Sequence, residues 1–256
     1  MIVIKNEHEI EAMKRAGRIA AAAREAAKAF IEAGTPDKMT TADVDRVVAR
    51  TIRENGASAT FLGYGGFPAS ACVSVNEEVI HGIPGERRLH SGDIVKVDVG
   101  ATFDGFVGDC AATFFVGTPS ENAKNLADVT RQSFWEAMKF AREGFRLSDI
   151  SHAVQSYAEE RGYGVIREYV GHGIGRKMHE DPEVPNFGNP GRGPRLLPGM
   201  TLAVEPMIAE GTWEVKRLAN HWTVVTVDAK LAAHYENTIL ITRGDPVILT
   251  HNEMNI

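Results

Sequence analysis

The sequence predicts an α+β fold made of two similar halves within one domain. Its length of 256 residues suits one large domain or two small ones. Two helical segments, a glycine-rich segment and strand-like runs follow one another, and this order occurs twice along the chain. The spacings between certain acids and glycines also recur in register. We therefore expect residues 1–256 to form a single domain with an internal duplication, whose halves are residues 1–117 and 118–256.

The first half begins with two predicted helices. Apolar residues recur at helical spacing over Glu7–Ala33, and Gly34 ends the pattern. A second helix opens at Thr40, where Asp43 completes a capping box, and Gly56 follows its last turn. These signals predict a pair of consecutive helices before any strand.

Strands follow the first helix pair, and the second half repeats the arrangement. Strand-like runs occur at Ala71–Val75 and Ile94–Phe103. In the second half we expect helices at residues 121–143 and 148–162, followed again by strands. Between helices and strands each half has a glycine-rich segment, with Gly63, Gly65 and Gly66 in the first and Gly171, Gly173 and Gly175 in the second.

Matched spacings support a duplication of a unit of over 100 residues rather than a short solenoid repeat. An acid lies six residues after a glycine in each half, and a second acid lies eight residues before another glycine. The matched pairs are Gly92–Asp98 with Gly199–Glu205, Asp109–Gly117 with Glu236–Gly244, and, in the helices, Asp43–Gly56 with Asp149–Gly162. Three matches in register predict that the four acids outside the helices meet where the halves join.

The predicted strand pairing brings two of these acids together. Asp104-Gly105 is a strong hairpin-turn signal, and a turn centred there pairs residues whose numbers sum to 209. Asp98 then faces Ala111, and Asp109 lies on the same face as a diagonal neighbour, about 7–8 Å away at Cα. This separation suits two carboxylates that reach one metal centre.

All four acids occur in apolar surroundings. One such acid is usually salt-bridged or caps a turn, but unpartnered buried carboxylates cost several kcal/mol each. The sequence offers no obvious buried cation for each acid. Two divalent ions would balance the four carboxylates, and the duplicated positions favour this interpretation.

Three histidines are candidates for the same site. His172 lies between two glycines, which allow close approach to a ligand, His179 follows it, and His81 lies in a separate segment. A lone histidine is more often a structural hydrogen-bonding group than a ligand. His234 shares a strand face with Glu236, but no other sequence feature recommends it.

Composition excludes some classes of protein. The net charge of −6 does not favour a nucleic-acid binder held by charge. No apolar run near the N-terminus is long enough for a signal peptide and none elsewhere is long enough to span a membrane, so we expect neither feature. Only Cys72 and Cys110 are present, which indicates a reducing compartment rather than a disulfide framework. We expect a cytoplasmic protein without a membrane or direct nucleic-acid partner.

The motifs together resemble those of the bacterial type I methionine aminopeptidases, from Ile10 to Thr250. The similar segments are Gly171-His172-Gly173-Ile174-Gly175-Arg176 with His179-Glu180, Ser74-Val75-Asn76 through His81-Gly82-Ile83-Pro84, Asp98-Val99, Gly105-Phe106, Gly108-Asp109, Met200-Thr201 through Glu205-Pro206, and Tyr235-Glu236-Asn237-Thr238. The resemblance implies the pita-bread fold, in which two pseudo-symmetric α/β halves with antiparallel sheets enclose a dinuclear metal site. It also implies removal of the initiator methionine from nascent proteins when the second residue is small.

The resemblance also implies roles for individual residues. Asp98 holds one metal, His172 and Glu205 hold the other, and Asp109 and Glu236 bridge both. This oxygen-rich set favours Mn, Fe or Co. Hydroxide from the metal centre attacks the scissile carbonyl, Glu205 shares the proton of the water, and His81 and His179 contact the substrate. The implied methionine pocket contains Tyr64, Phe67, Cys72, His81, Met178 and Trp222, although each alone is more often a core residue. Phe61 replaces a cysteine found in some bacterial relatives.

Other interpretations remain open from the sequence. An X-Pro peptidase would share the fold and ligands, but such enzymes usually carry an additional N-terminal domain, for which no room precedes residue 7. A catalytically inactive interaction protein would lack some ligands, and a dinuclear phosphoesterase would need phosphate-binding features. The proline-rich segment at residues 180–199 is either a stiff surface loop or a border of the substrate cleft. The expected enzyme is a monomer acting on nascent N-termini, including those at the ribosome.

Overall fold

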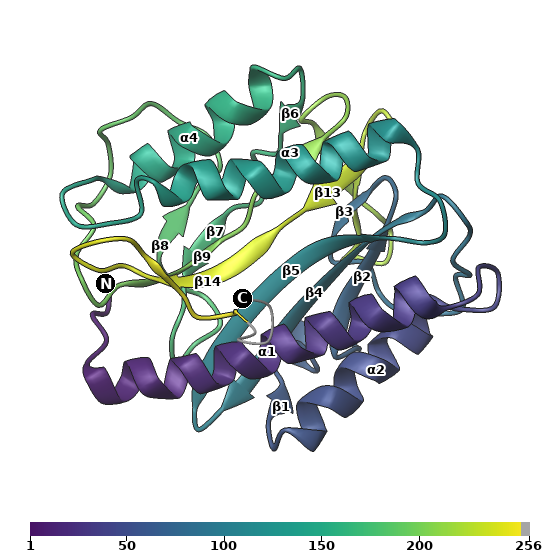
Figure 1. Ribbon diagram of the computed structural model, residues 1–256, viewed down its shortest axis with the longest axis horizontal. Helices are drawn as coiled ribbons and strands as arrows, with labels where there is room; N and C mark the ends of the chain where they lie inside the picture. Colours follow the sequence, from purple (N-terminus) through teal and green to yellow (C-terminus); the bar gives the residue numbers. More distant parts are fainter. Residues whose placement is uncertain (252–256) are drawn as a thin grey trace.

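A long antiparallel sheet runs through the molecule and joins strands from both parts of the chain (Figure 1). The computed structural model describes residues 1–251. The strand order is β1-β4-β5-β14-β9-β7-β8, with β2 also paired to β4 and β15 to β14. The bounds are β1 Ser58–Ala59, β2 Ala71–Val75, β4 Ile94–Phe103, β5 Phe106–Phe115, β7 Gly171–Gly173, β8 Glu180–Val184, β9 Thr201–Val204, β14 Glu236–Leu240 and β15 Val247–Ile248.

Two small antiparallel sheets lie beside the long one. One has the order β13-β10-β6 and the other β11-β12-β3. Their bounds are β3 Glu78–Ile80, β6 Gly164–Val165, β10 Met207–Ala209, β11 Val215–Arg217, β12 Val224–Thr226 and β13 Ala232–His234. β13 leads almost directly into β14, so a chain segment passes from a small sheet into the centre of the long one.

The α-helices of the described residues pack as pairs, α1 with α2 and α3 with α4 (Figure 1). They are α1 Glu7–Ala33, α2 Thr41–Glu54, α3 Glu121–Met138 and α4 Leu147–Glu159, and a short 3-10 turn η1 spans Tyr64–Gly66. One apolar core lies between the first pair and β2, β4 and β5. A second core lies between the other pair and β9, β10, β13 and β14. Apolar burial at about 25 cal/mol per Å² is the main force that holds each helix pair to its strands.

Most predicted elements of the first half are confirmed. The bounds of α1, β2 and β4 are those predicted, and α2 has its capping box at Thr40 and Asp43. The β4–β5 hairpin has the predicted register, with Asp98 opposite Ala111 and Gly100 opposite Asp109. The assignment of residues 118–256 to a second half stays a prediction, and its last residues, 252–256, lie outside the described part of the chain.

The predicted ends of the two helices in the second half are wrong. The helix expected at residues 121–143 is α3, which ends at Met138. Beyond it, the amide of Phe140 bonds to Ala137 and that of Glu143 bonds to the carbonyl of Thr242. These contacts turn the chain out of the helix, although apolar Phe140 and Ala141 continue the helical pattern. The following helix, expected at residues 148–162, is also shorter and ends at Glu159.

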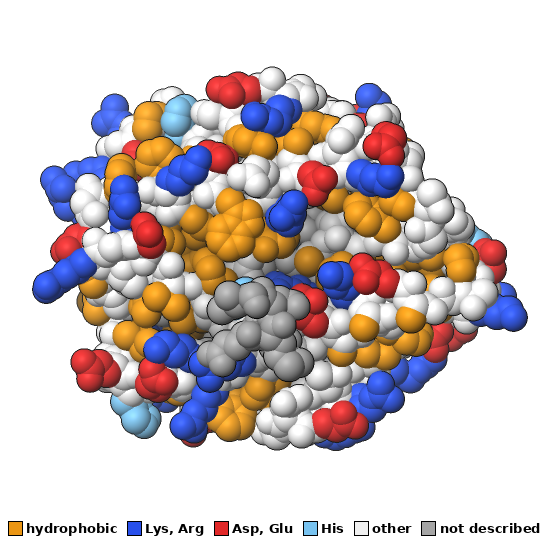
Figure 2. Space-filling model, in the orientation of Figure 1, with side chains coloured by type: hydrophobic (Ala, Val, Ile, Leu, Met, Phe, Trp, Pro, Cys, Tyr) orange, Lys and Arg blue, Asp and Glu red, His pale blue; other side chains and the backbone are white. Residues whose placement is uncertain are grey.

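The surface has a mixed character. On the face shown in Figure 2, acidic and basic side chains are interspersed among apolar ones. Within residues 1–251, none of the helices is long and apolar enough to cross a membrane.

Candidate metal centre

The four predicted carboxylates converge on neighbouring strands of the long sheet. Asp98 lies on β4, Asp109 on β5 and Glu236 at the start of β14, whereas Glu205 follows the end of β9. Ala111 pairs with Asp98 on one side and with Glu236 on the other, so the two acids lie in one row across the sheet. Asn237 pairs with Val204, which brings Glu205 beside Glu236. Strand register therefore gathers residues that are up to 138 positions apart in the chain.

His172 completes the predicted group. It lies on β7 opposite Ala203 of β9, and its side chain is buried. Nε2 is 3.6 Å from Asp109 Oδ2 and 3.6 Å from Glu205 Oε1. Nδ1 lies 2.9 Å from the carbonyl oxygen of Gly173. In a metal-binding histidine, the ring nitrogen that does not bind the metal commonly donates its N–H to a carbonyl. A proton on Nδ1 of His172 leaves Nε2 available as a ligand atom.

Within residues 1–251, no lysine or arginine forms an ion pair with these carboxylates. Burial raises the pKa of Asp98, Glu205 and Glu236 well above their usual ranges, and the nearby charge of Asp109 raises each further. Asp98 Oδ1, Asp109 Oδ1 and Glu236 Oε1 are buried and have no hydrogen-bond partner in the described part of the chain. Among residues 1–251, only histidines form ion pairs with these acids. Buried, unpaired acids of this kind are expected where a cation binds.

The donor set fits a pair of metal ions. Ligand atoms of Asp109, His172 and Glu236 lie within 4.8 Å of one another, and so do those of Asp98, His234 and Glu236. The two groups share Glu236, as expected for a carboxylate between two ions. Carboxylate and imidazole donors of this kind are typical ligands of divalent metal ions.

His234 is the member of this centre that the sequence pattern did not single out. It is buried, and its Nε2 is 3.7 Å from Glu236 Oε2 and 3.9 Å from Glu205 Oε2. Burial lowers the pKa of His234 to about 3. The one available sequence signal was its position two residues before Glu236, which places both side chains on one strand face.

A single cavity of about 190 Å³ joins the metal-binding residues to the predicted substrate residues. All five predicted ligands line it, and so do His81, His179 and the predicted pocket residues. The sequence prediction missed Ile80, Tyr169 and Val170, which line it as well. Phe61, noted for its difference from some relatives, also lines this cavity. A mainly apolar cavity with a few convergent polar groups is typical of a small-substrate site.

Aromatic contacts fix part of the cavity wall. Phe67 and Trp222 meet edge to face, with ring centroids 5.1 Å apart. His81 contacts the rings of Trp222 and Tyr169 at 6.3 Å and 5.8 Å. His81 has a positive φ of 57°, an uncommon conformation for a residue with a side chain. Burial and, to a lesser extent, nearby His179 together lower the pKa of His81 to about 4, so the ring is neutral near pH 7.

His179 is positioned from two sides. Its Nδ1 lies 2.7 Å from the hydroxyl oxygen of Tyr64, and its ring meets His172 with centroids 4.4 Å apart. Burial lowers the pKa of His179, and His172 lowers it further. The segment that follows borders a hollow also lined by His172 and His179, through Glu180, Asp181 and Glu183. The start of the proline-rich segment therefore lies close to His172 and His179, and its role as a border of the substrate cleft stays a prediction.

Fold and site together define a pita-bread metallopeptidase, and comparison with known proteins agrees. The profile of metallopeptidase family M24 matches residues 11–243, and the chain belongs to this family. The methionine aminopeptidase of Clostridium acetobutylicum is 55% identical over 251 residues, covering 98% of this chain and 99% of the relative. Methionine aminopeptidase 1 of Bacillus subtilis is 49% identical over 250 residues, covering 98% and 99%. The predicted resemblance to bacterial methionine aminopeptidases is confirmed.

Solved structures support the same conclusion. The crystal structure of methionine aminopeptidase from Thermotoga maritima superimposes with a TM-score of 0.95 at 47% identity, covering 98% of this chain and 100% of that one. Prolidase from Pyrococcus furiosus gives a TM-score of 0.76 at 23% identity, covering 98% of this chain and 66% of that one. The second likeness shows the shared pita-bread fold alone. The predicted fold class is therefore confirmed.

Proposed function

We propose that this chain is a metal-dependent aminopeptidase that removes the initiator methionine from nascent proteins whose second residue is small. The observation that carries the proposal is the single cavity, because it combines five candidate metal ligands with an apolar wall suited to a thioether. The similarity to methionine aminopeptidases along nearly the whole chain supports the same substrate.

The proposed ligands divide between two divalent ions. Asp98 binds one ion, His172 and Glu205 bind the other, and Asp109 and Glu236 bind both. When bound, the ions supply Lewis-acid polarisation of the scissile carbonyl and lower the pKa of water. Glu205 shares the proton of the attacking water. Mn, Fe and Co are the proposed ions, since the donors are oxygen-rich.

The remaining cavity residues bind the substrate. Phe67 and Trp222, with Tyr64, Cys72 and Met178, form the methionine pocket, where sulfur and aromatic groups favour a thioether. His81 donates a hydrogen bond from its neutral ring to the scissile amide. His179 contacts the substrate, and its hydrogen bond with the Tyr64 hydroxyl orients its ring. We propose that Tyr169 and Val170, which line the same cavity, limit the size of the second residue.

The proposed setting is the cytoplasm, where the protein acts as a monomer on nascent chains, including those at the ribosome. Nucleic acid and membrane are not proposed as direct partners. The net charge of −6 and the interspersed charges in Figure 2 agree with a small peptide substrate rather than a polyanion.

The test is a peptide panel assayed with demetallated protein reloaded with Mn, Fe or Co in turn. Met-Ala-Ser and Met-Gly peptides should be cleaved well and Met-Leu peptides poorly. Chelated protein should be inactive, and added metal should restore activity. Full activity after demetallation, verified by elemental analysis, would exclude the proposed chemistry. A preference for an Ala-Pro peptide over Met-Ala-Ser would instead favour the X-Pro peptidase.

A further inference from the structure

His234 has a buried side chain whose ring nitrogens lack hydrogen-bond partners within residues 1–251. Its side chain is only 2% exposed. Within the described part of the chain, neither Nδ1 nor Nε2 has a hydrogen-bond partner. A buried donor or acceptor left without a partner costs about 1–3 kcal/mol. Such a residue therefore needs either a ligand or a role that repays this cost.

The backbone of His234 is fixed so that its ring reaches the metal centre. Its amide donates to Thr113 Oγ1 at 3.0 Å, and the same hydroxyl donates to the His234 carbonyl at 2.9 Å. Thr113 lies on β5, four residues after Asp109. On its other side, His234 pairs with Met207 of β10. Both polar backbone groups are thus anchored to a strand that also carries a proposed metal ligand.

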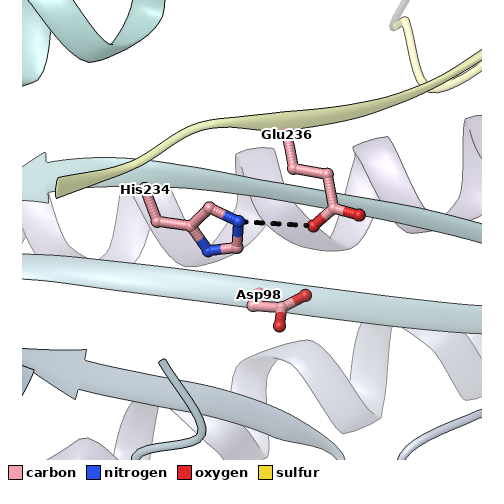
Figure 3. A group of neighbouring side chains, drawn as sticks. All are labelled: Asp98, His234 and Glu236. Atoms are coloured by element: carbon pink, nitrogen blue, oxygen red, sulfur yellow. Dashed lines mark ion pairs between the residues drawn. The ribbon is translucent and has the colours of Figure 1, made fainter. Parts of the chain in front are cut away.

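The ring points toward the acids of the centre. Figure 3 shows the His234 imidazole beside the carboxyl groups of Glu236 and Asp98. Nε2 is 3.7 Å from Glu236 Oε2 and 3.9 Å from Glu205 Oε2. The ligand atoms of Asp98, His234 and Glu236 lie within 4.8 Å of one another.

These distances match shared ligation better than direct hydrogen bonding. A hydrogen bond between a ring nitrogen and a carboxylate spans about 2.7–3.2 Å, which is shorter than either contact. Two donors that each lie about 2.0–2.2 Å from one ion can be up to about 4.4 Å apart. Both contacts of Nε2 fall below that limit, so an ion can lie between the ring and a carboxylate.

We propose that His234 is a sixth metal-binding residue, which ligates through Nε2 the ion held by Asp98 and Glu236. This inference rests on the proposed dinuclear centre. It gives the Asp98 ion an imidazole of its own, as His172 does for the second ion. With two imidazoles the centre favours Co and Fe over Mn more than a set with one imidazole would, because imidazole suits the later metals better.

The direct test counts imidazoles on the metal in the wild-type protein. Demetallated protein is loaded with two equivalents of Co(II), and its proton NMR spectrum is recorded in water. Each imidazole bound to Co(II) gives a strongly shifted, exchangeable N–H signal. Two signals are expected in the wild type. His234→Gln, which keeps a polar side chain, should show one, whereas His8→Gln should show two because His8 is an exposed residue of α1.

A second readout is the affinity for each ion, measured by calorimetric titration of demetallated protein with Co(II). His234→Gln should weaken one of the two binding events at least about tenfold, as changes beside a metal commonly do, and leave the other unchanged. His8→Gln should leave both unchanged. Circular dichroism of the variants verifies that each is folded.

Different results would overturn the role of His234 and the dinuclear centre on which that role rests. Wild-type protein that binds two Co(II) ions but shows a single shifted imidazole signal would exclude His234 as a ligand. A weakened affinity in His234→Gln together with that single signal would assign His234 a hydrogen-bonding role, again against the proposal. Wild-type protein that binds no Co(II) would overturn the dinuclear centre itself. The wild-type spectrum needs no variant, so a poorly folded variant would not prevent the decision.

Discussion

Replacing His172 or His81 by alanine should separate metal binding from substrate contact. His172 Nε2 lies 3.6 Å from a carboxylate oxygen of Asp109 and 3.6 Å from one of Glu205. The His81 ring instead contacts the rings of Tyr169 and Trp222. His172→Ala should therefore lose part of its metal, whereas His81→Ala should keep it.

The expected size of the His81 effect follows from its proposed hydrogen bond to the scissile amide. A positioned proton donor contributes about 10²–10⁴-fold, which corresponds to roughly 3–5 kcal/mol of barrier. Since burial lowers the pKa of His81 to about 4, the neutral ring donates through its N–H near pH 7. His81→Ala should thus lower kcat by at least about a hundredfold at full metal content. His172→Ala should lower activity through metal loss, and excess metal should restore part of it.

The assay combines elemental analysis of the purified variants with kcat on a Met-Ala peptide over a range of metal concentrations. Two intact ions in His172→Ala, with depleted metal in His81→Ala, would reverse the two assignments. A wild-type kcat in His81→Ala would show that its contacts with Tyr169 and Trp222 are only structural.

Two further substitutions test how the fold supports the site. Gly108→Ala should destabilise the protein by about 1–3 kcal/mol in urea unfolding, because the new Cβ would lie 2.5 Å from backbone atoms of Gly17 in α1. The control is Gly244→Ala, whose new Cβ would meet no atom of residues 1–251 within 4 Å, and its stability should stay near the wild-type value. Tyr64→Phe should lower kcat/KM about 2–13-fold without metal loss, because it removes one hydrogen bond of about 0.5–1.5 kcal/mol to His179; an unchanged kcat/KM would show that His179 does not need this contact.

The hairpin that carries Asp98 and Asp109 was predictable because its register is a local property. Asp104-Gly105 specifies a tight turn, and the two-residue period of a strand then fixes which side chains share a face. The structure has the expected pairing of Asp98 with Ala111. Local turn chemistry thus determined the geometry of half of the acid cluster.

Long-range pairing was predictable only in outline. The duplicated spacings predicted that the acids of the two halves meet, but no local pattern specifies that Glu236 pairs with Ala111. That pairing joins residues 125 positions apart, and it depends on how the two helix-covered cores pack together. The predicted end of α3 was wrong for a related reason, because the hydrogen bond from the Glu143 amide to the Thr242 carbonyl is a tertiary contact.

His234 shows where reasoning from duplication stops. The comparison of halves matches Glu236 with Asp109, and the residue two positions before Asp109 is Val107, a buried apolar side chain. Features shared by both halves are visible as repeated spacings, whereas a residue present in one half leaves no such signal. The carboxylates come in equal numbers from the two predicted halves, but His172 and His234 both come from the predicted second half. If both imidazoles bind metal, the predicted second half supplies both nitrogen donors. The metal centre is then asymmetric in its nitrogen ligands, although its carboxylates are divided equally between the predicted halves.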